Sequence, residues 1–396
     1  MSDWPRLHLG EIFEIARGGS PRPIDAYITD AEDAINWISI ADASDSAKYI
    51  ERTKRRIRRE GATRSRWVVP GDLLLTNSMS FGRPYIMRTT GCIHDGWLVL
   101  AKKREGIDQD FFYRLLGSDA VYAEFAKLAA GATVKNLNID LVKGVAVPVP
   151  PLAEQRRIAA ILDQADALRA KRREALAQLD SLTQSIFIEM FGDPVENSKR
   201  WPTIKLGEHT AKMGSGATPS GGDAAYKASG ISLIRSLNVR DGVFAYKDLA
   251  YIDDAQAAKL SNVVVCGGDV LLNITGASVA RVCRAPIDVL PARVNQHVMI
   301  IRPRSTIDGV FLERMLLSPT MKRLLLQIGG SGATREAITK AQAAELKVIC
   351  PPLALQQTFA TRIQAVESLK ATHRAALAES DALFASLQHR AFAGGL

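Results

Sequence analysis

The chain has 396 residues, of which 47% are hydrophobic, and it carries 51 basic against 42 acidic residues, a formal net charge of +9. This length suggests two or three domains, and the basic excess permits a polyanionic partner without establishing one. There is no apolar run of about 18 residues, no signal-peptide core at the start and no CxxC pair among the four cysteines, so we expect a cytoplasmic protein without a membrane span, a zinc site or a disulfide framework.

The first 150 residues predict a domain of mixed α and β structure. Short apolar runs at residues 37–40, 72–75 and 97–100 are typical of strands, and residues 111–128 predict a helix. Glycine and proline separate these segments, as expected for the loops of a globular domain.

Residues 151–191 predict one long helix, because they contain no glycine and no proline after Pro151. Spacings of four and three residues alternate along one face, which is the pattern of a coiled-coil seam. The predicted seam consists of Ile161, Ala165, Leu168, Arg172, Ala175, Leu179, Leu182 and Ile186. Gly192-Asp193-Pro194 then ends the helix, and about 39 residues at about 1.5 Å each give a rod of about 58 Å.

The second half of the chain repeats the first. Five short matches occur in the same order, and the offset between the copies rises slowly, as small loop insertions would produce. Chance similarity would not keep this order. The matching segments are 9–11 and 206–208, 71–75 and 268–272, 107–111 and 307–311, 131–133 and 332–334, and 150–155 and 351–356.

The second copy also ends in a predicted long helix, which begins at Pro352. Its seam consists of Ile363, Val366, Lys370, His373, Leu377, Ser380, Phe384 and Leu387. A single amphipathic rod cannot hide its seam from water, whereas two rods of matched length can hide each other's, with Arg172 and His373 at the same repeat position.

These elements predict an α+β fold with two homologous mixed domains in tandem. Two long antiparallel, coiled-coil-like helices join and separate the domains, and the repetition implies pseudo-two-fold symmetry. The expected boundaries are 1–150 and 193–351 for the domains, and 151–192 and 352–396 for the helices. Two independent domains, each with its helix folded back on itself, remain the alternative.

The common catalytic and cofactor motifs are absent from the sequence. There is no GxxxxGK[ST] loop, GxSxG elbow, HExxH pair or [ND]PPY tetrad, and the six histidines are scattered. We therefore expect neither catalytic residues nor a metal site, and favour a binding protein, although an enzyme with an unfamiliar site stays open.

A dense basic cluster lies in the first domain. Eight basic residues accompany Glu60 between residues 52 and 66, namely Arg52, Lys54, Arg55, Arg56, Arg58, Arg59, Arg64 and Arg66. Such a cluster can neutralise phosphates and make binding depend steeply on salt. A solvated charged surface without a partner is the alternative.

The second domain spreads its arginines among amide side chains. Arginine can pair with guanine, and asparagine or glutamine with adenine, in the major groove. The candidates are Arg235, Arg281, Arg284 and Arg293, together with Asn273, Asn295 and Gln296. Strand ends and turns are also rich in these residue types, so any one of them can be structural instead.

Three loops recur in both domains and combine small polar residues with glycine and arginine. Such loops let a backbone approach phosphate while a side chain reaches a base edge, although ordinary turn chemistry explains them as well. The candidate DNA contacts are Ser20, Arg22 and Thr218 in the first loop, Asn77, Ser78, Arg83, Thr275 and Arg281 in the second, and Thr133, Lys135, Asn136, Thr334 and Arg335 in the third.

The duplicated pattern resembles the specificity subunit of type I restriction–modification systems. The matching text is VPVPPLAEQRRIAAIL and EMFGDP in the first copy and VICPPLALQQTFATRI in the second, which ends AFAGGL in place of the Phe-Gly-Asp-Pro stop. Each motif is weak alone, whereas their duplicated order is specific and spans essentially the whole chain.

The resemblance implies that each domain is a target recognition domain reading one half of a bipartite, asymmetric DNA site. It further implies that the helices set the unread spacer and dock two modification (methyltransferase) subunits, which restriction subunits join. S-adenosylmethionine, ATP and magnesium are then expected only in the partner subunits, and this chain is not itself an enzyme.

Apolar residues beside the seam are candidates for contacting the modification subunits, with extra packing between the two helices as the alternative. They are Leu162, Leu176, Phe187, Met190, Leu369 and Leu383. A two-headed scaffold that binds only proteins is the competing function, and the basic cluster argues against it.

Overall fold

The computed structural model describes residues 4–44, 48–77, 81–130, 137–330 and 336–396. The chain divides into two compact units. Unit 1 comprises Met1–Arg172 and Ala376–Leu396, and unit 2 comprises Arg173–Ala375. Each unit therefore holds one mixed domain together with part of both long helices.

Unit 1 contains two main sheets and a short strand pair. The first sheet has the order β2 (Phe13–Arg17), β10 (Trp97–Lys102), β7 (Leu73–Thr76), β8 (Pro84–Met87) and β4 (Tyr49–Ile50), antiparallel except for β4 against β8. The second has the order β5 (Arg55–Ile57), β3 (Ile35–Ile38), β9 (Gly91–Ile93) and β6 (Arg66–Val68), with β3 parallel to β9. Strands β1 (Arg6–His8) and β11 (Ala146–Pro148) pair separately.

Short helices connect and cover these sheets. They are α1 (Leu9–Ile12), η1 (Ile24–Ala26), α2 (Ile40–Ser44), α3 (Arg59–Ala62), α4 (Gln109–Leu116), α5 (Asp119–Ala130) and α6 (Ile139–Lys143). The single helix predicted over 111–128 is two helices, because Gly117 ends α4 and the Ser118 hydroxyl accepts a hydrogen bond from the amide of Val121 in α5.

Unit 2 repeats these two sheets, except that among the described residues its first sheet has four strands and lacks a counterpart of β4. The first has the order β13 (Thr210–Ser215), β22 (Val298–Pro303), β19 (Val270–Asn273) and β20 (Val282–Arg284). The second has the order β17 (Ala250–Ile252), β14 (Ile231–Ile234), β21 (Ala292–Val294) and β18 (Val264–Val265), with β14 parallel to β21. Strands β12 (Thr203–Lys205) and β23 (Lys347–Ile349) pair, and a ribbon of β15 (Val239–Arg240) and β16 (Val243–Phe244) is added.

The helices of unit 2 follow the same plan. They are α8 (Asp254–Ala258), α9 (Gly309–Leu316), α10 (Pro319–Gly330) and α11 (Lys340–Ala344), with short turns η2 (Leu206–His209), η3 (Gly222–Ala225), η4 (Ser236–Asn238), η5 (Ser261–Val263), η6 (Gly276–Ser278) and η7 (Ile287–Val289). Four strands of each sheet follow the same order in both units, and the parallel pair β3 and β9 corresponds to β14 and β21, so the predicted repeat of a mixed domain is confirmed.

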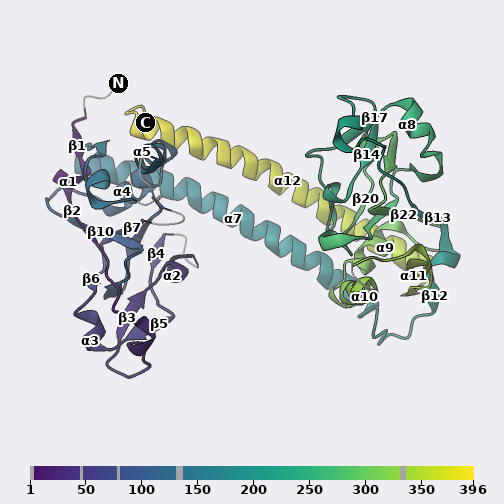
Figure 1. The fold of residues 1–396 in the computed structure, drawn as a ribbon, viewed down its shortest axis with the longest axis horizontal. Helices are drawn as coiled ribbons and strands as arrows, with labels where there is room; N and C mark the ends of the chain where they lie inside the picture. Colours follow the sequence, from purple (N-terminus) through teal and green to yellow (C-terminus); the bar gives the residue numbers. More distant parts are fainter. Residues whose placement is uncertain (1–3, 45–47, 78–80, 131–136, 331–335) are drawn as a thin grey trace. The chain divides into compact units, whose positions relative to one another are not determined.

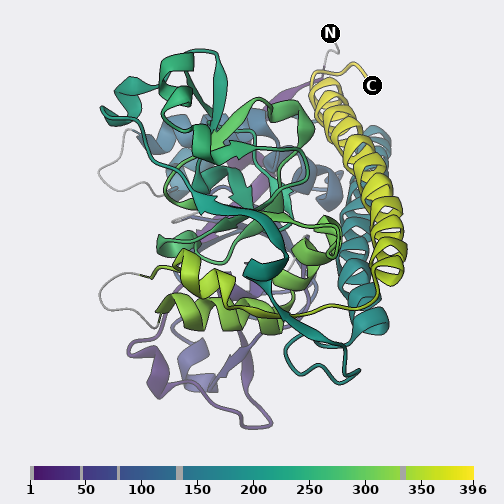
Figure 2. The same ribbon diagram turned by 90° about the vertical axis from the view of Figure 1, so that its right-hand side faces the viewer.

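The two predicted long helices are α7 (Leu152–Phe191) and α12 (Leu353–Phe392), each of 40 residues and hence about 60 Å long. In unit 1 the start of α7 runs antiparallel to the end of α12, since Arg157 contacts Leu396 and Arg169 contacts Asp381 (Figures 1 and 2). In unit 2 the pairing is again antiparallel, with Lys370 against Asp180 and Phe359 against Phe191. Among the described residues no helix is long and apolar enough to cross a membrane.

The predicted seam of α12 is confirmed, because all eight of its residues are buried or half-buried. The predicted seam of α7 is wrong at two of its eight positions, and the other six residues are buried or half-buried. Leu168 and Leu182 are 57% and 44% exposed, whereas Arg169 and Thr183, one residue later in each case, face inward. The error has a physical cause, since the inward polar groups find partners. Arg169 pairs with Asp381, and the Thr183 hydroxyl donates to the carbonyl of Leu179.

Aromatic side chains fix each domain to its part of the helix pair. In unit 1, Phe111 of α4 packs edge-on against Phe392 of α12, with ring centroids 5.7 Å apart. In unit 2, Phe311 of α9 meets Phe187, Phe191 and Phe359 from both long helices. These residues belong to one continuous core in each unit, so domain and helices share their packing.

Candidate nucleic-acid interface

In unit 1 three segments meet at Asp95, in the turn that joins β9 to β10. The Ser20 hydroxyl donates a hydrogen bond to the Asp95 carboxylate at 2.8 Å, and Arg22 lies 3.4 Å from the other carboxylate oxygen. The side chains of Arg17 and Asn77 both donate to the backbone carbonyl of Asp95, at 2.8 and 3.0 Å. The structure therefore brings together the predicted residues Ser20, Arg22 and Asn77, with Asn77 itself buried.

A pocket opens beside this junction. Its wall consists of Ser20, Pro21, Arg22, Pro23, Ile24, Trp37, Arg55, His94 and Asp95. Gly18 is required here, because a Cβ at this position would lie 2.0 Å from the carbonyl oxygen of His94. The pocket thus joins cationic, aromatic and acidic groups from β3, β5 and two loops.

The pKa values of Asp95 and His94 are both lowered, which favours the charged form of Asp95 but the neutral form of His94. The hydrogen bond from Ser20 is the main cause that lowers the pKa of Asp95, so this carboxylate stays ionised. Burial lowers the pKa of His94 despite the neighbouring Asp95, so the imidazole is favoured in its neutral form.

The basic cluster lies along the edges of the second sheet of unit 1. Arg55 and Arg56 belong to edge strand β5, Arg58 and Arg59 begin α3, and Arg66 lies on the opposite edge strand β6. In Figure 1 this sheet occupies the part of unit 1 that lies away from the long helices. Arg56 donates to the carbonyl of Asp30, and Arg59 forms an exposed pair with Asp33 at 3.4 Å.

Unit 2 has a related junction with different side chains. The Thr218 hydroxyl donates to the Gln296 side-chain oxygen at 2.5 Å, and the Gln296 amide nitrogen lies 3.1 Å from Nε2 of His297. Nδ1 of His297 lies 2.5 Å from the Thr275 hydroxyl. Thr218, Gln296, His297 and Thr275 therefore form one polar chain across three loops, which includes the predicted residues Thr218, Thr275 and Gln296.

Other predicted contacts in unit 2 support the fold instead. Asn273 is fully buried and donates to the carbonyls of Ser236 and Val239, and buried Asn295 accepts from the amide of His297. Their expected access to bases is wrong, because burial in the domain leaves neither amide a free face. An amide in the sequence does not reveal whether its side chain is needed to pair backbone groups.

Three of the predicted arginines of unit 2 have partners within the domain. Arg284 pairs with buried Glu313 at 3.1 Å, Arg293 donates to the carbonyls of Ala257 and Ala292, and Arg235 donates to the carbonyl of Asp248 and lies over the ring of Tyr226. Arg281 is half-buried. Arg83, its equivalent in unit 1, is exposed and lines a different pocket, beside α4 and the long helices.

Six predicted residues lie outside the described residues: Ser78, Thr133, Lys135, Asn136, Thr334 and Arg335. Residues that follow the third loop make equivalent backbone contacts in the two units. The amide of Leu137 donates to the carbonyl of Asn77, and that of Ile338 donates to the carbonyl of Ile274.

The sequence interpretation missed Trp37, His94, Asp95 and His297. The signal was a turn of equal length, residues 94–96 and 295–297, between equivalent strands of the two copies. The sequence candidates were basic, hydroxyl and amide residues, so they did not include the acidic residue Asp95 at the centre of the junction.

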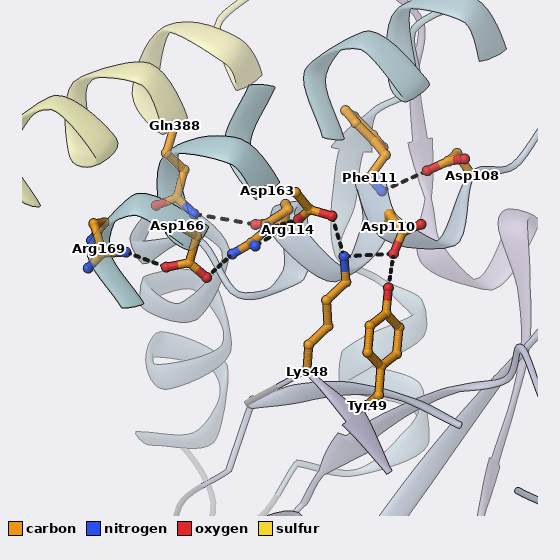
Figure 3. Close-up of polar contacts among 10 residues, drawn as sticks. All are labelled: Lys48, Tyr49, Asp108, Asp110, Phe111, Arg114, Asp163, Asp166, Arg169 and Gln388. Carbon is orange, nitrogen blue, oxygen red and sulfur yellow. Dashed lines mark hydrogen bonds and ion pairs between the residues drawn. The ribbon is translucent and has the colours of Figure 1, made fainter. Parts of the chain in front are cut away.

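A second polar cluster anchors the domain of unit 1 to the helices (Figure 3). Lys48 lies between Asp110 of α4 and Asp163 of α7, at 2.7 and 2.6 Å. Burial opposes the charge of Lys48, but its hydrogen bonds to both carboxylates outweigh burial and raise the pKa of the ammonium. Arg114 pairs with Asp163 at 2.7 Å and with Asp166 at 3.0 Å.

The cluster continues across the helix pair and recurs in unit 2. Arg169 bridges Asp166 and Asp381, at 2.8 and 2.6 Å. In unit 2, Arg314 contacts Glu367 at 3.1 Å, and Lys370 bridges Glu367 and Asp180, at 2.9 and 2.6 Å. Each unit thus has an ionic chain from the domain helix through one long helix to the other.

The exposed apolar residues of the helices differ from those expected. Leu162 and Phe187 are buried in the cores, so their expected exposure is wrong, and Leu176 and Met190 are half-buried. Leu369 and Leu383 are exposed as expected, at 46% and 57%. Leu168 and Leu182 join them, so each unit has two exposed leucines beside its interhelical ion pair: Leu168 and Leu383 in unit 1, and Leu369 and Leu182 in unit 2.

The described residues contain no group of three or more histidine, cysteine or acidic side chains arranged to hold a metal ion. The four cysteines are free thiols. Burial raises the pKa of Cys92 to about 11 and that of Cys283 to about 12, so these two are poor nucleophiles.

The chain thus contains a repeated mixed domain, with a polar loop junction in each copy, and two long helices that pair antiparallel in each unit. Residues 1–178 match the family described as the type I restriction modification DNA specificity domain. The MjaIX specificity subunit of Methanocaldococcus jannaschii is 21% identical over 382 residues, which cover 91% of this chain and 86% of that protein. The EcoBI specificity subunit of Escherichia coli is 24% identical over 368 residues, which cover 83% and 74%.

Solved structures share the fold. A structure reported for complex assembly and conformational transition of the type I R-M system has a TM-score of 0.61 at 20% identity, covering 99% of this chain and 98% of that one. The type I restriction–modification S subunit from M. genitalium has a TM-score of 0.60 at 14% identity, covering 98% and 96%. Residues 1–178 therefore match a type I DNA specificity domain, and the chain is similar over most of its length to type I restriction–modification specificity subunits, which agrees with the expectation of a recognition subunit.

Proposed function

We propose that this chain recognises a bipartite, asymmetric site in double-stranded DNA, and that each repeated domain reads one half of it. One observation carries the proposal. The two domains share a backbone frame, whereas the side chains at the equivalent junctions differ, Ser20 with Asp95 in one and Thr218 with Gln296 in the other. A shared frame with different readers suits two different half-sites.

The basic edge of unit 1 supplies the nonspecific part of the binding energy in this proposal. Arg55 on β5, the N-cap residue Arg58 and Arg59 at the start of α3 are exposed, and Arg55 also lines the pocket beside Asp95. Phosphate contacts fix the position of a protein on the duplex but carry no sequence information. We assign these arginines to positioning and the loop junctions to readout.

The proposal is tested with the full chain and its modification subunits on a library of duplexes with random sequence. Selection of a two-part motif with an unread spacer is the expected result. Equal binding to all sequences at every salt concentration would instead support a protein scaffold without DNA recognition. Methyl transfer by the chain alone, given S-adenosylmethionine, would revive an enzymatic function.

We propose that two modification subunits dock on the helices, one at each pair of exposed leucines. The pairs are equivalent: Leu168 precedes Arg169 and Leu369 precedes Lys370, while Leu383 and Leu182 each follow the partner aspartate by two residues. Two copies of one leucine pair fit two copies of one partner. Restriction subunits would join this core. The modification and restriction subunits would supply the sites for S-adenosylmethionine, ATP and magnesium. The complex would act in the cytoplasm.

Docking is tested by serine substitutions at the leucine pairs. Leu168→Ser with Leu383→Ser should leave one modification subunit bound per chain, and adding Leu182→Ser with Leu369→Ser should leave none, as counted by native mass spectrometry. A matched control is Val243→Ser with Ile287→Ser, two apolar residues exposed on the second domain. Full occupancy of all variants would place docking elsewhere.

The helices are proposed to set the length of the unread spacer. Insertion of one heptad in both α7 and α12 keeps the seam in register, because a heptad is two turns of a coiled coil. The selected motif should then have a longer spacer with unchanged half-sites. If the spacer stayed the same, the length of the helices would not set the distance between the half-sites.

A further inference from the structure

The middle residues of the two equivalent turns have corresponding roles. Asp95 is the second of three residues between β9 and β10, and Gln296 is the second of three between β21 and β22. Each accepts a hydrogen bond from a hydroxyl three residues beyond a corresponding strand, Ser20 after β2 and Thr218 after β13. The two contacts therefore tie together the same two loops in both domains.

The side chains at these positions nevertheless have different chemistry. A carboxylate can only accept hydrogen bonds, whereas a carboxamide both donates and accepts. The Asp95 side chain is 41% exposed, and Gln296 is exposed as well. Both side chains therefore have polar atoms that are not used in the contact between the loops. These exposed atoms can bind a ligand.

An acid is an unexpected group at a surface that meets polyanionic DNA. Asp95 is surrounded by cations: Arg17 and Arg22 contact it, and Arg55 lines the same pocket. These charges offset repulsion between the carboxylate and phosphate. Of the groups on the major-groove edges of the bases, a carboxylate can accept a hydrogen bond only from an amino group, and cytosine N4 is the usual partner.

Gln296 has the complementary capability. Its oxygen accepts from Thr218 and its nitrogen lies beside His297, which fixes the plane of the amide. One N–H and one oxygen lone pair remain, and this pair matches the N7 acceptor and N6 donor of adenine.

We propose that Asp95 and Gln296 are equivalent specificity-determining residues, with Asp95 reading a cytosine in one half-site and Gln296 reading an adenine in the other. This inference rests on the proposed DNA recognition and extends it to two residues and two bases. Ser20 and Thr218 act as positioning residues, because they hold the reading groups without facing the bases themselves.

The first test uses Asp95→Asn and Gln296→Glu in the full chain with modification subunits, on the duplex motif selected by the unaltered complex. Asp95→Asn keeps an oxygen for the Ser20 hydrogen bond but adds a donor. We expect it to lower the preference for cytosine at one base pair roughly ten- to a hundredfold and to leave the other half-site unchanged. Gln296→Glu should do the same for one adenine in the other half-site only. Asp119→Asn and Gln357→Glu, which change exposed residues away from the junctions, are the matched controls.

The main comparison of a second test uses the unaltered protein. The unaltered complex is measured on duplexes in which single cytosines lack the N4 amino group, or single adenines lack the N6 amino group. One cytosine in one half-site and one adenine in the other should each weaken binding by a similar factor. The cytosine analogue should make no further difference to Asp95→Asn.

The outcomes separate this inference from the proposed function. A selected two-part motif together with unchanged base preferences in both variants and no effect of the analogues would overturn the assignment of readers alone. Absence of any selected motif would overturn DNA recognition itself, and with it this inference.

Discussion

The side chain of Gln155, at the start of α7, accepts a hydrogen bond at 2.9 Å from the backbone amide of Asp108, the residue that caps α4. Its amide nitrogen donates to the carbonyls of Gly106 and Pro150, at 3.0 and 2.8 Å. Asp108 in turn accepts from the amide of Phe111. One fully buried glutamine thus fastens the long helix to the cap of the domain helix.

The same arrangement recurs in unit 2. Gln356 accepts from the amide of Asp308 at 2.9 Å and donates to the carbonyls of Pro351 and Thr306, at 2.7 and 3.3 Å. Two of the repeated sequence matches, 107–111 with 307–311 and 150–155 with 351–356, are therefore the two halves of one contact. Their repetition follows from the need to place a domain on a helix twice.

Replacing Gln356 by alanine should destabilise unit 2 by about 3 kcal/mol, because it leaves buried backbone donors and acceptors without partners. Urea unfolding measures the loss, and hydrogen exchange of peptides from α9 locates it. The neighbouring exposed residue gives the control, since Gln357→Ala should change stability by less than about 0.5 kcal/mol. If the two substitutions had equal effects, the hydrogen bonds of Gln356 would not stabilise the contact between α12 and the cap of α9.

The ion pair between Arg169 and Asp381 should contribute a coupling of about 1 kcal/mol in a double-mutant cycle with Arg169→Met and Asp381→Asn. The partly buried position of Arg169 favours the charge pair, and added salt should reduce the coupling. The cycle is measured by urea unfolding at low and high salt. A cycle on the exposed pair Glu154 and Arg157 is the control, and a coupling no larger than the control's would contradict the expectation.

The repeat, the two long helices and the mixed domains could be predicted because they depend on patterns that persist over tens of residues. The register of α7 could not, because Leu168 and Leu182 are apolar yet face outward, while Arg169 and Thr183 are polar yet face inward with partners. Composition along a helix does not show which polar residue has a partner on another helix.

The candidate site was predicted in part for a related reason. Ser20, Arg22 and Thr218 lie in loops that the repeat itself singled out, and the structure places them at the junctions. Asn273 and Asn295 have the residue type of a base reader but are used inside the domain. Distinguishing them requires knowledge of which backbone groups lack partners, and that knowledge comes only from the fold.

Replacing Arg55 and Arg58 by alanine should weaken DNA binding by the complex across all sequences and make it less sensitive to salt. Each lost phosphate contact lowers the slope of log affinity against log salt by about 0.9. Fluorescence anisotropy at several salt concentrations measures this slope for a selected and an unrelated duplex.

A matched variant is Lys102→Ala with Arg104→Ala, which removes two exposed charges from the end of β10 opposite the Asp95 turn. This control should keep the original slope. If both variants lower the slope equally, the charge of the whole domain, and not the edge of the second sheet, governs binding.

The neutral state of His94 should make unit 1 less stable in mild acid. Burial lowers the pKa of His94 below the ordinary 6.5, so between these two pKa values the unfolded chain binds a proton that the folded chain does not. The contribution of His94 is therefore fully present above pH 6.5 and is lost as the pH falls below it. Urea unfolding between pH 8 and pH 5 should show this decline.

The repeat offers a conservative replacement, because the equivalent residue in unit 2 is Asn295, which does not titrate. His94→Asn should reduce the loss of stability between pH 6.5 and pH 5, since an uncharged amide takes its place in the turn. His389→Asn, at an exposed position near the end of α12, should leave the pH dependence unchanged. If His94→Asn and the original chain declined equally with falling pH, some group other than His94 would account for the acid sensitivity of unit 1.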